Sequence, residues 1–272
     1  MELIIKPKNK WWQFDWKELW FFRDLFYFLT WRDVKVKYKQ TMIGASWAIF
    51  QPFITMVIFT IFFGKLSQMP SDDIPYPIFV YTGLLFWTLF NTGLAAASNS
   101  FVMNEKIITK IYFPRIILPI SAIITSIIDF LIASLILAGM MVYYQYSPSF
   151  IGIILIPILV SMTILSTLGI GLLFSSINVK YRDVRFILPF FMQLLLFLTP
   201  VIYPVSIAPE HLRWILGINP MSGVIDTARA EILGTASVDW LLLGVSAISM
   251  FLYCIIGLLY FKKVERHFAD VI

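Results

Sequence analysis

The sequence predicts an all-α integral membrane protein, and its composition is the first support for this prediction. Apolar residues make up 59% of the 272 residues and charged residues only 14%, whereas a soluble domain has nearer half apolar and a quarter charged residues. The apolar residues are grouped in long runs, and the mean hydropathy is +0.82. Cys254 is the single cysteine, which excludes a disulfide-stabilised secreted scaffold. The apolar content also excludes intrinsic disorder.

Six apolar runs have about the length of a membrane-spanning helix. Such a helix needs about 20 mostly apolar residues, because the hydrocarbon layer is roughly 30 Å thick and a helix rises 1.5 Å per residue. The residues between the runs are too scattered to form a soluble domain, so we expect residues 1–272 to form a single transmembrane domain. The six predicted spans are residues 43–64, 78–97, 116–142, 150–177, 186–202 and 240–261.

The basic residues predict the orientation of these spans. Of the 21 Lys and Arg residues, 18 lie before the first span, in the loops 98–115 and 178–185, or after the last span. By the positive-inside rule, both termini are cytoplasmic. The net charge of +5 therefore reflects topology and contact with anionic membrane lipid, and no nucleic-acid partner is expected.

Before the first span, residues 11–30 have the pattern of an amphipathic helix. Bulky apolar residues recur at helical spacing, with Lys17 and Asp24 on the opposite side. We expect this helix to lie in the cytoplasmic interface, mainly as an anchor, although a docking surface is compatible with the same pattern. Residues 32–40 alternate apolar and basic side chains, which fits either a strand or a helical lead-in to the first span.

The cytoplasmic loop after the second span predicts a short amphipathic helix at residues 104–112. Ile107, Ile108 and Ile111 form its apolar face, among Glu105, Lys106 and Lys110, and Pro114 ends the segment. Such a helix can insert into a groove on a cytoplasmic partner. The alternative is a surface helix that rests on lipid headgroups.

On the outer side, residues 203–239 contain two short helix signals. The first covers residues 209–216. In the second, Asn219 is a suitable N-cap for Pro220 at the first helical position, and the pattern ends at Gly234. Both segments are too short to cross a membrane. Because Pro200 and Pro204 precede them, we expect a helix pair that re-enters the outer leaflet.

No catalytic or metal-binding group is found in the sequence. His211 and His267 are predicted on opposite sides of the membrane, so the two cannot form a metal site within one chain. There is no nucleophile motif of the G-x-S-x-G type and no phosphate-binding loop of the G-x-x-x-x-G-K-[ST] type. We therefore expect neither an enzyme nor ATP hydrolysis by this chain.

Asp129 is the only charged residue within a predicted span. A carboxylate in a bilayer is costly, so a functional role is the first hypothesis. The structural alternative is a satisfied group that hydrogen-bonds to Ser126 or Thr125 one turn away. An ion-coupled carrier would need a partner charge within a span, and the other spans offer no Lys, Arg, His or Glu in their interiors.

Aromatic residues make up 17% of the chain, and two groups share one helix face each. Helix packing or lipid contact explains single residues, but as sets they favour a pathway for a large, amphipathic, sugar-rich molecule. The first set lies on the second span: Phe79, Phe86 and Phe90, with Gly83. The second set lies on the fifth span: Phe186, Phe190, Gln193 and Phe197.

Five stretches of the sequence, spread over the whole chain, carry a family resemblance. They are residues 32–52 (RDVKVKYKQTMIGASWAIFQP), 104–119 (NEKIITKIYFPRIILP), 178–185 (NVKYRDVR), 198–204 (LTPVIYP) and 219–229 (NPMSGVIDTAR). In this order they resemble the membrane (permease) subunit of bacterial type-2 ABC exporters. Within that family they are most similar to the exporters of O-antigen, capsular or teichoic polysaccharides.

The resemblance implies an architecture and partners. It implies six spans, an interfacial helix, a coupling helix at residues 104–112 and two outer gate helices within residues 204–234. It also implies a homodimer of this chain in the bacterial inner membrane, with two copies of a separate ABC ATPase. ATP and Mg would bind that ATPase, so no cofactor is expected in this chain.

The activity that the resemblance implies is ATP-driven export of a polyprenyl-diphosphate-linked polysaccharide through a channel on the dimer axis. The residues expected to couple to the ATPase are Glu105, Lys106, Ile107, Ile108, Lys110, Ile111, Tyr112, Arg182 and Asp183. Those expected along the channel are Phe79, Phe86, Phe90, Asp129, Phe186, Phe190, Gln193 and Phe197. Those expected at the outer gate are Pro200, Tyr203, Pro204, Asn219 and Pro220.

Four basic residues before the first span have two interpretations. They can attract the diphosphate or a lipid headgroup, or they can serve only as a positive-inside anchor. They are Arg32, Lys35, Lys37 and Lys39. The alternatives for the whole chain are an ABC exporter of a drug or small lipid, an ion-coupled secondary carrier, and a membrane scaffold without a pathway.

Overall fold

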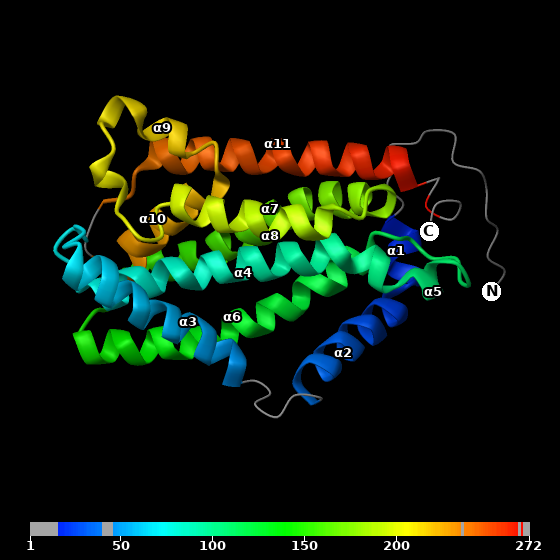
Figure 1. Ribbon diagram of the computed structural model, residues 1–272, viewed down its shortest axis with the longest axis horizontal. Coiled ribbons are helices and arrows are strands. Elements are labelled where there is room, and N and C mark those ends of the chain that lie inside the picture. Colours follow the sequence, from blue (N-terminus) through cyan, green and yellow to red (C-terminus); the bar gives the residue numbers. More distant parts are fainter. Residues whose placement is uncertain (1–15, 40–45, 235–236, 266–267, 269–272) are drawn as a thin grey trace.

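The structure, a computed structural model, describes residues 16–39, 46–234, 237–265 and 268. Every regular element in this part of the chain is a helix, which confirms the predicted all-α class. Figure 1 shows the long helices side by side in an elongated bundle, with short helices at both ends.

Five segments are long and apolar enough to cross a membrane. The first is α3 (Ser46–Phe59), continued by the π-helical segment η1 (Thr60–Leu66). The other four agree with the predicted second, third, fourth and sixth spans: α4 (Tyr76–Met103), α6 (Ile117–Tyr144), α7 (Phe150–Lys180) and α11 (Trp240–Val264).

The ends of these helices follow from local capping. The Ser149 side chain accepts a hydrogen bond from the Gly152 amide (2.7 Å) at the start of α7, and Asp239 accepts one from the Leu242 amide (3.0 Å) at the start of α11. Each cap satisfies one of the four unpaired N–H groups of a helix N-terminus. Helices α7 and α11 therefore begin at the residues predicted for the fourth and sixth spans.

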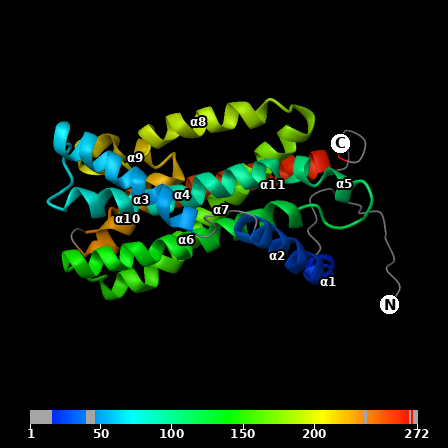
Figure 2. The same ribbon diagram turned by 60° about the horizontal axis from the view of Figure 1, so that its bottom comes forward.

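The predicted fifth span, residues 186–202, is helical over a shorter range. Helix α8 (Val184–Leu198) has 15 residues and a length of about 22 Å, against a hydrocarbon thickness of roughly 30 Å. The chain leaves the helix before Pro200, since a proline lacks the N–H group and disfavours helical geometry at the preceding residue. Helix α8 is therefore a shorter apolar helix than the five candidate spans. Figure 2 shows it along one side of the bundle.

Residues 16–39 form two helices, α1 (Trp16–Phe21) and α2 (Arg23–Lys39). The alternating pattern therefore belongs to a helix and not to a strand over residues 32–39, and residue 40 lies outside the described residues. Residues 11–15 of the predicted interfacial helix lie outside the described residues. Leu29 is buried and Phe22 and Phe26 pack against the same apolar cluster, so the predicted apolar face contacts the protein. Trp20 and Tyr27 are exposed, and the anchor role stays a prediction.

The two short outer helices occur where the sequence predicts them. Helix α10 (Pro220–Leu233) begins after Asn219, whose side chain accepts a hydrogen bond from the Met221 amide (3.1 Å). It ends at Gly234, which has the left-handed φ of 64° that favours glycine. The first predicted short helix, residues 209–216, forms η3 (Glu210–Leu212) and α9 (Arg213–Leu216). The short 3-10 helix η2 (Val205–Ile207) precedes them.

Helix α4 is the centre of the molecule. It packs mainly against α6 and α7, and also against α3 and α10. As a result, 78% of the residues in its most apolar 18-residue stretch are buried. A separate apolar cluster, called here the Phe101 cluster, lies at the C-terminal end of α4. It joins Leu29 of α2, Phe101 of α4, Phe261 of α11 and Phe268. This cluster holds the short helix α5 (Glu105–Ile108) through Ile108.

Helices α7 and α11 approach each other at a pair of glycines. A Cβ atom added at Gly257 would lie 1.9 Å from the carbonyl oxygen of Gly169, and one added at Gly169 would lie 2.6 Å from the backbone of Cys254. Small residues at a crossing allow two transmembrane backbones to make direct contact. The α7–α11 interface therefore has no room for a side chain at this point.

We predict that Gly257→Ala lowers the thermal unfolding temperature of the purified protein in detergent. The added methyl group forces the backbones apart, at a cost of about 1–3 kcal/mol for overpacking. Gly244→Ala on the same helix is the control, since no heavy atom lies within 4 Å of that position. Equal unfolding temperatures for the two variants would contradict the close crossing.

Candidate functional site

A groove between α4 and α8 combines amide, aromatic and basic side chains. It encloses a cavity of about 370 Å³. On α4, Asn91 and Asn99 lie on one face because they are eight residues apart, close to two helical turns. Gln193 and Arg185 face them from α8, and Trp87 lies beside them. This is the combination of hydrogen-bonding groups and a flat apolar surface that a sugar ring can use.

The outward face of α8 carries aromatic side chains that do not line this groove. Phe186, Phe190 and Phe197 are 69%, 63% and 52% exposed, while Val184, Leu188 and Met192 of the same helix are buried against the bundle. Gln193 is exposed on the same helix. The predicted aromatic set on the fifth span therefore occupies a surface that is free in the single chain.

The predicted aromatic set on the second span does not lie on a surface. Phe79, Phe86 and Phe90 are at most 1% exposed, because α4 is the central helix of the bundle. Phe86 makes an edge contact with Phe130 of α6, and Phe79 packs against Tyr76. We correct the prediction accordingly: these three residues belong to the protein interior, and we no longer assign them to a channel surface.

Arg229 of α10 holds the break after α8 in place. Its guanidinium donates to the carbonyl oxygens of Pro200 (2.6 Å), Val201 (2.5 Å) and Phe79 (3.1 Å). It also lies over the Phe79 ring, 3.6 Å from the centroid. The carbonyls of Pro200 and Val201 lie beyond the end of α8 and have no helical partner, and the arginine supplies the missing donors. The bond to Phe79 ties the same arginine to α4.

Arg229 lies within the predicted outer region 203–239, where no role was expected for it. The structure buries it to 4% exposure. Its position on the apolar face of the predicted helix 219–234 was a signal that could have singled it out. Gly83 of α4 is required beside it, because a Cβ there would lie 2.6 Å from Nη2 of Arg229.

The predicted outer-gate residues meet around this arginine. Asn219 donates to the Thr199 hydroxyl (2.7 Å), and the Tyr203 hydroxyl donates to the Leu198 carbonyl (2.8 Å). Pro200 provides one of the acceptors for Arg229, and Pro220 is the first residue of α10. Pro204 lines a small outer cavity of about 180 Å³.

This outer cavity also contains acidic groups. Asp72, Asp226 and Asp239 line it together with Arg213 and Arg229. Burial raises the pKa of Asp226 to about 6, and the charge of Arg229 opposes this rise. Among the described residues, no cluster of His, Cys, Asp or Glu fits a metal ion.

The segment predicted as a coupling helix is helical only over Glu105–Ile108, as α5. Ile108 is buried and Ile107 packs against the Phe101 cluster, whereas Ile111 and Tyr112 are 56% and 54% exposed. The predicted apolar face is thus divided between the interior and the surface. Lys106 and Lys110 are exposed.

Hydrogen bonds connect this segment to the N-terminal helices. The Tyr112 hydroxyl donates to Glu18 of α1 (2.8 Å), and burial, then this bond, raises the pKa of Tyr112 to about 12. Arg32 of α2 pairs with Asp33 (2.7 Å) and donates to the Asn104 side chain (2.8 Å). Arg32 is therefore engaged within the protein.

The other predicted cytoplasmic residues are exposed. Arg182 and Asp183 lie in the turn between α7 and α8, and Lys35 and Lys39 lie on the surface of α2. The first pair is thus accessible to a partner, as a coupling loop would require. Lys37 is engaged in an ion pair.

Asp129 of α6 pairs with the end of α2. Lys37 forms an ion pair with its carboxylate, and the Tyr38 hydroxyl donates to it (2.5 Å). The prediction that Asp129 bonds to Ser126 or Thr125 was therefore wrong about the partners, which come from outside the spans. Burial and the bond to Asp129 raise the pKa of Tyr38, so this hydroxyl remains a donor.

The family model for ABC-2 type transporters matches residues 24–233. The chain belongs to this family. The match covers α2 to α10, and thus the groove, the segment 104–112 and the Arg229 site.

Three curated relatives illustrate the similarity. The O-antigen export system permease protein RfbA of Klebsiella pneumoniae is 29% identical, over 92% of this chain and 95% of its own length. The protein of the same name from Myxococcus xanthus is 28% identical, over 79% and 82%. The polysialic acid transport protein KpsM of Escherichia coli is 23% identical, over 74% and 78%.

We predict that Arg229→Met strongly destabilises this ABC-2 family member. The substitution leaves at least two buried carbonyl groups without donors, at about 1–3 kcal/mol each. The readouts are the thermal unfolding temperature and faster amide hydrogen exchange at residues 199–203.

Arg213→Met is the matched control for this prediction, because Arg213 donates to the Ala208 carbonyl (3.1 Å) at the surface of the same region. It should change the unfolding temperature little. If the two variants unfold at the same temperature, Arg229 does not hold the break.

Proposed function

We propose that this chain is the transmembrane subunit of an ATP-driven ABC exporter of a lipid-linked, O-antigen-like polysaccharide. The observation that carries the proposal is the α4–α8 groove. Amide groups of Asn91 and Gln193 bond sugar hydroxyls, and the exposed aromatic side chains of α8 offer surfaces for ring faces. The names of the relatives, which are permeases for O-antigen and polysialic acid, point to the same class of cargo.

The proposed assembly is a homodimer with two ABC ATPase subunits. The exposed phenylalanines of α8 would then line a shared channel instead of facing lipid. In the inner membrane, α8 together with residues 199–203 would make the sixth crossing, which leaves both termini cytoplasmic. The helices α9 and α10 would be the re-entrant outer gate.

Energy would come from the partner subunits. This chain lacks a phosphate-binding loop, so ATP and Mg would bind the ATPase, and the chain itself is not an enzyme. Conformational work would reach the spans through α5 and the turn with Arg182 and Asp183. The hydrogen bonds from Tyr112 to Glu18 and from Arg32 to Asn104 would pass it on to the N-terminal helices.

The other functions considered have weaker support. An ion-coupled carrier needs a carboxylate that can release its ion, whereas Asp129 is already paired with Lys37. An exporter of a drug or small lipid would be served by an apolar pathway, and the amide row of the α4–α8 groove does not favour such a cargo.

We predict that Asn91→Leu combined with Gln193→Leu lowers polysaccharide export in a strain that lacks the chromosomal gene. Each lost hydrogen bond is worth about 0.5–1.5 kcal/mol, a two- to tenfold effect. The measurement is surface polysaccharide at matched protein levels, with the lipid-linked form expected to accumulate inside the cell.

The control for the groove is Asn91→Gln, which retains an amide and should retain most export. Full export by the double variant would remove the groove from the pathway. An unchanged surface polysaccharide in the deletion strain itself would overturn the proposed function.

We further predict that Ile111→Asp prevents co-purification of the ATPase. Burying an isoleucine side chain is worth about 1.5–3 kcal/mol, roughly a ten- to hundredfold change in affinity. Ile111 is the suitable target because Ile107 and Ile108 contribute to the fold.

Ile207→Asp is the control for this pull-down, since Ile207 is similarly exposed (51%) in η2, among the proposed outer-gate elements. It should leave ATPase recovery unchanged. Equal recovery with Ile111→Asp would shift the docking role to Arg182 and Asp183 or to the N-terminal helices.

A further inference from the structure

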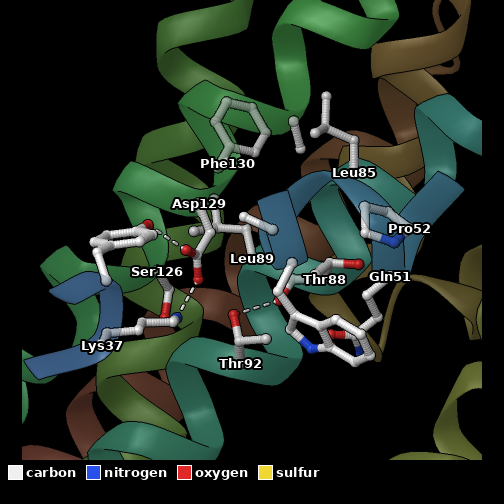
Figure 3. A pocket seen from close by; sticks show the side chains of 14 residues that line it. Lys37, Gln51, Pro52, Leu85, Thr88, Leu89, Thr92, Ser126, Asp129 and Phe130 are labelled. Atoms are coloured by element: carbon white, nitrogen blue, oxygen red, sulfur yellow. Dashed lines mark hydrogen bonds and ion pairs between the residues drawn. The ribbon is translucent and has the colours of Figure 1, made fainter. Parts of the chain in front are cut away.

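A third cavity, of about 470 Å³, lies between α3, α4 and α6 at the end of α2. Figure 3 shows the Lys37 and Asp129 pair on one side of it and Gln51 and Pro52 of α3 on the other. Its lining residues differ from those of the α4–α8 groove. The cavity therefore calls for an explanation separate from the polysaccharide pathway.

The walls of this cavity are mostly apolar. Pro52, Leu85, Leu89, Phe130 and Ala133 form them. At about 30 Å³ per water-sized group, the volume holds roughly fifteen such groups. A cavity of this size, with mostly apolar walls and a few polar groups, is typical of a ligand site. Its shape suits a hydrocarbon chain better than a sugar.

The charged groups that line the cavity lie at the end of α2, where Lys37, Tyr38 and Asp129 meet. Uncharged polar groups occur elsewhere in the lining: Gln51, Thr88, Thr92 and Ser126. The side chain of Lys37 is 43% exposed and that of Asp129 only 10%, so a ligand can approach the ammonium group without entering the protein core. Lys35 and Lys39 are exposed on the same helix. An anionic group is therefore attracted to this end of the cavity.

We propose that this cavity binds one acyl chain of an anionic membrane phospholipid, whose phosphate competes with Asp129 for Lys37. The chain would occupy the apolar walls, and the phosphate would accept hydrogen bonds from the ammonium group. When Lys37 turns to the phosphate, α2 loses its ion pair to α6, while the bond from Tyr38 to Asp129 and the packing of α2 against α6 remain. Bound lipid thus loosens the link between the interfacial helix and the spans.

The binding test uses phosphatidylglycerol with brominated acyl chains, added to the purified full chain in detergent. Bromine quenches tryptophan fluorescence on contact, and Trp47 lines the cavity. Because the chain has nine tryptophans, the contribution of Trp47 is obtained as the difference between wild type and Trp47→Phe. We expect this difference to saturate with added lipid.

Two pairs of variants test where and how the lipid binds. Ala48→Phe fills the cavity from α3 and should abolish the saturable quenching. Ala138→Phe, at an exposed position of α6 outside the lining, should leave it unchanged. Lys37→Gln should weaken binding roughly fivefold, whereas Asp129→Asn should strengthen it, because the competing carboxylate is removed.

Several outcomes would overturn the proposal. Unchanged quenching in Ala48→Phe would place the lipid elsewhere. Weaker binding in Asp129→Asn would show that the ion pair only supports the fold. Equal quenching by brominated phosphatidylcholine would exclude selection by charge. Stronger competition by a polyprenyl phosphate than by phosphatidylglycerol would assign the cavity to the lipid anchor of a cargo. None of these results depends on whether the chain exports polysaccharide.

Discussion

The arrangement of this bundle depends on one constraint, that backbone polar groups shielded from water need partners inside the protein. Helices satisfy it throughout the five long spans. The exception is the break after α8, where the carbonyl groups of Pro200 and Val201 have no helical donors. Arg229 provides them and also bonds Phe79 of α4. The position of α8, and with it the α4–α8 groove, follows from this contact.

The sequence was sufficient for the parts that rest on local rules. Run length located the long spans, and the Asn219–Pro220 start and Gly234 end of α10 followed from capping. The sequence was insufficient where the surroundings of a residue depend on how the helices pack against one another. The face shared by Phe79, Phe86 and Phe90 could lie toward a channel or toward the interior, and only the position of α4 among its neighbours decides this. The length of α8 likewise depends on where the Pro200 break is held.

The charged side chains illustrate the same limit. Counting Lys and Arg predicts the sides of the membrane, but it treats every charge alike. The structure separates them: Arg229 bonds backbone carbonyls, Arg32 bonds Asn104, and Lys37 pairs with Asp129, while Lys35 and Lys39 remain on the surface. Long-range pairs such as Lys37 with Asp129 join segments about ninety residues apart, and no spacing rule within one helix could reveal them.

The glycine contact between α7 and α11 has a mechanical consequence. At Gly169 and Gly257 the two backbones touch directly, so no side chain at this point can change rotamer to let one helix slide past the other. Packed interfaces of this kind move as units. Helices α7 and α11 would therefore travel as a single rigid body in any working stroke. Movement between helices would then occur where packing is sparse, as between α8 and the rest of the bundle, since α8 makes few contacts with it.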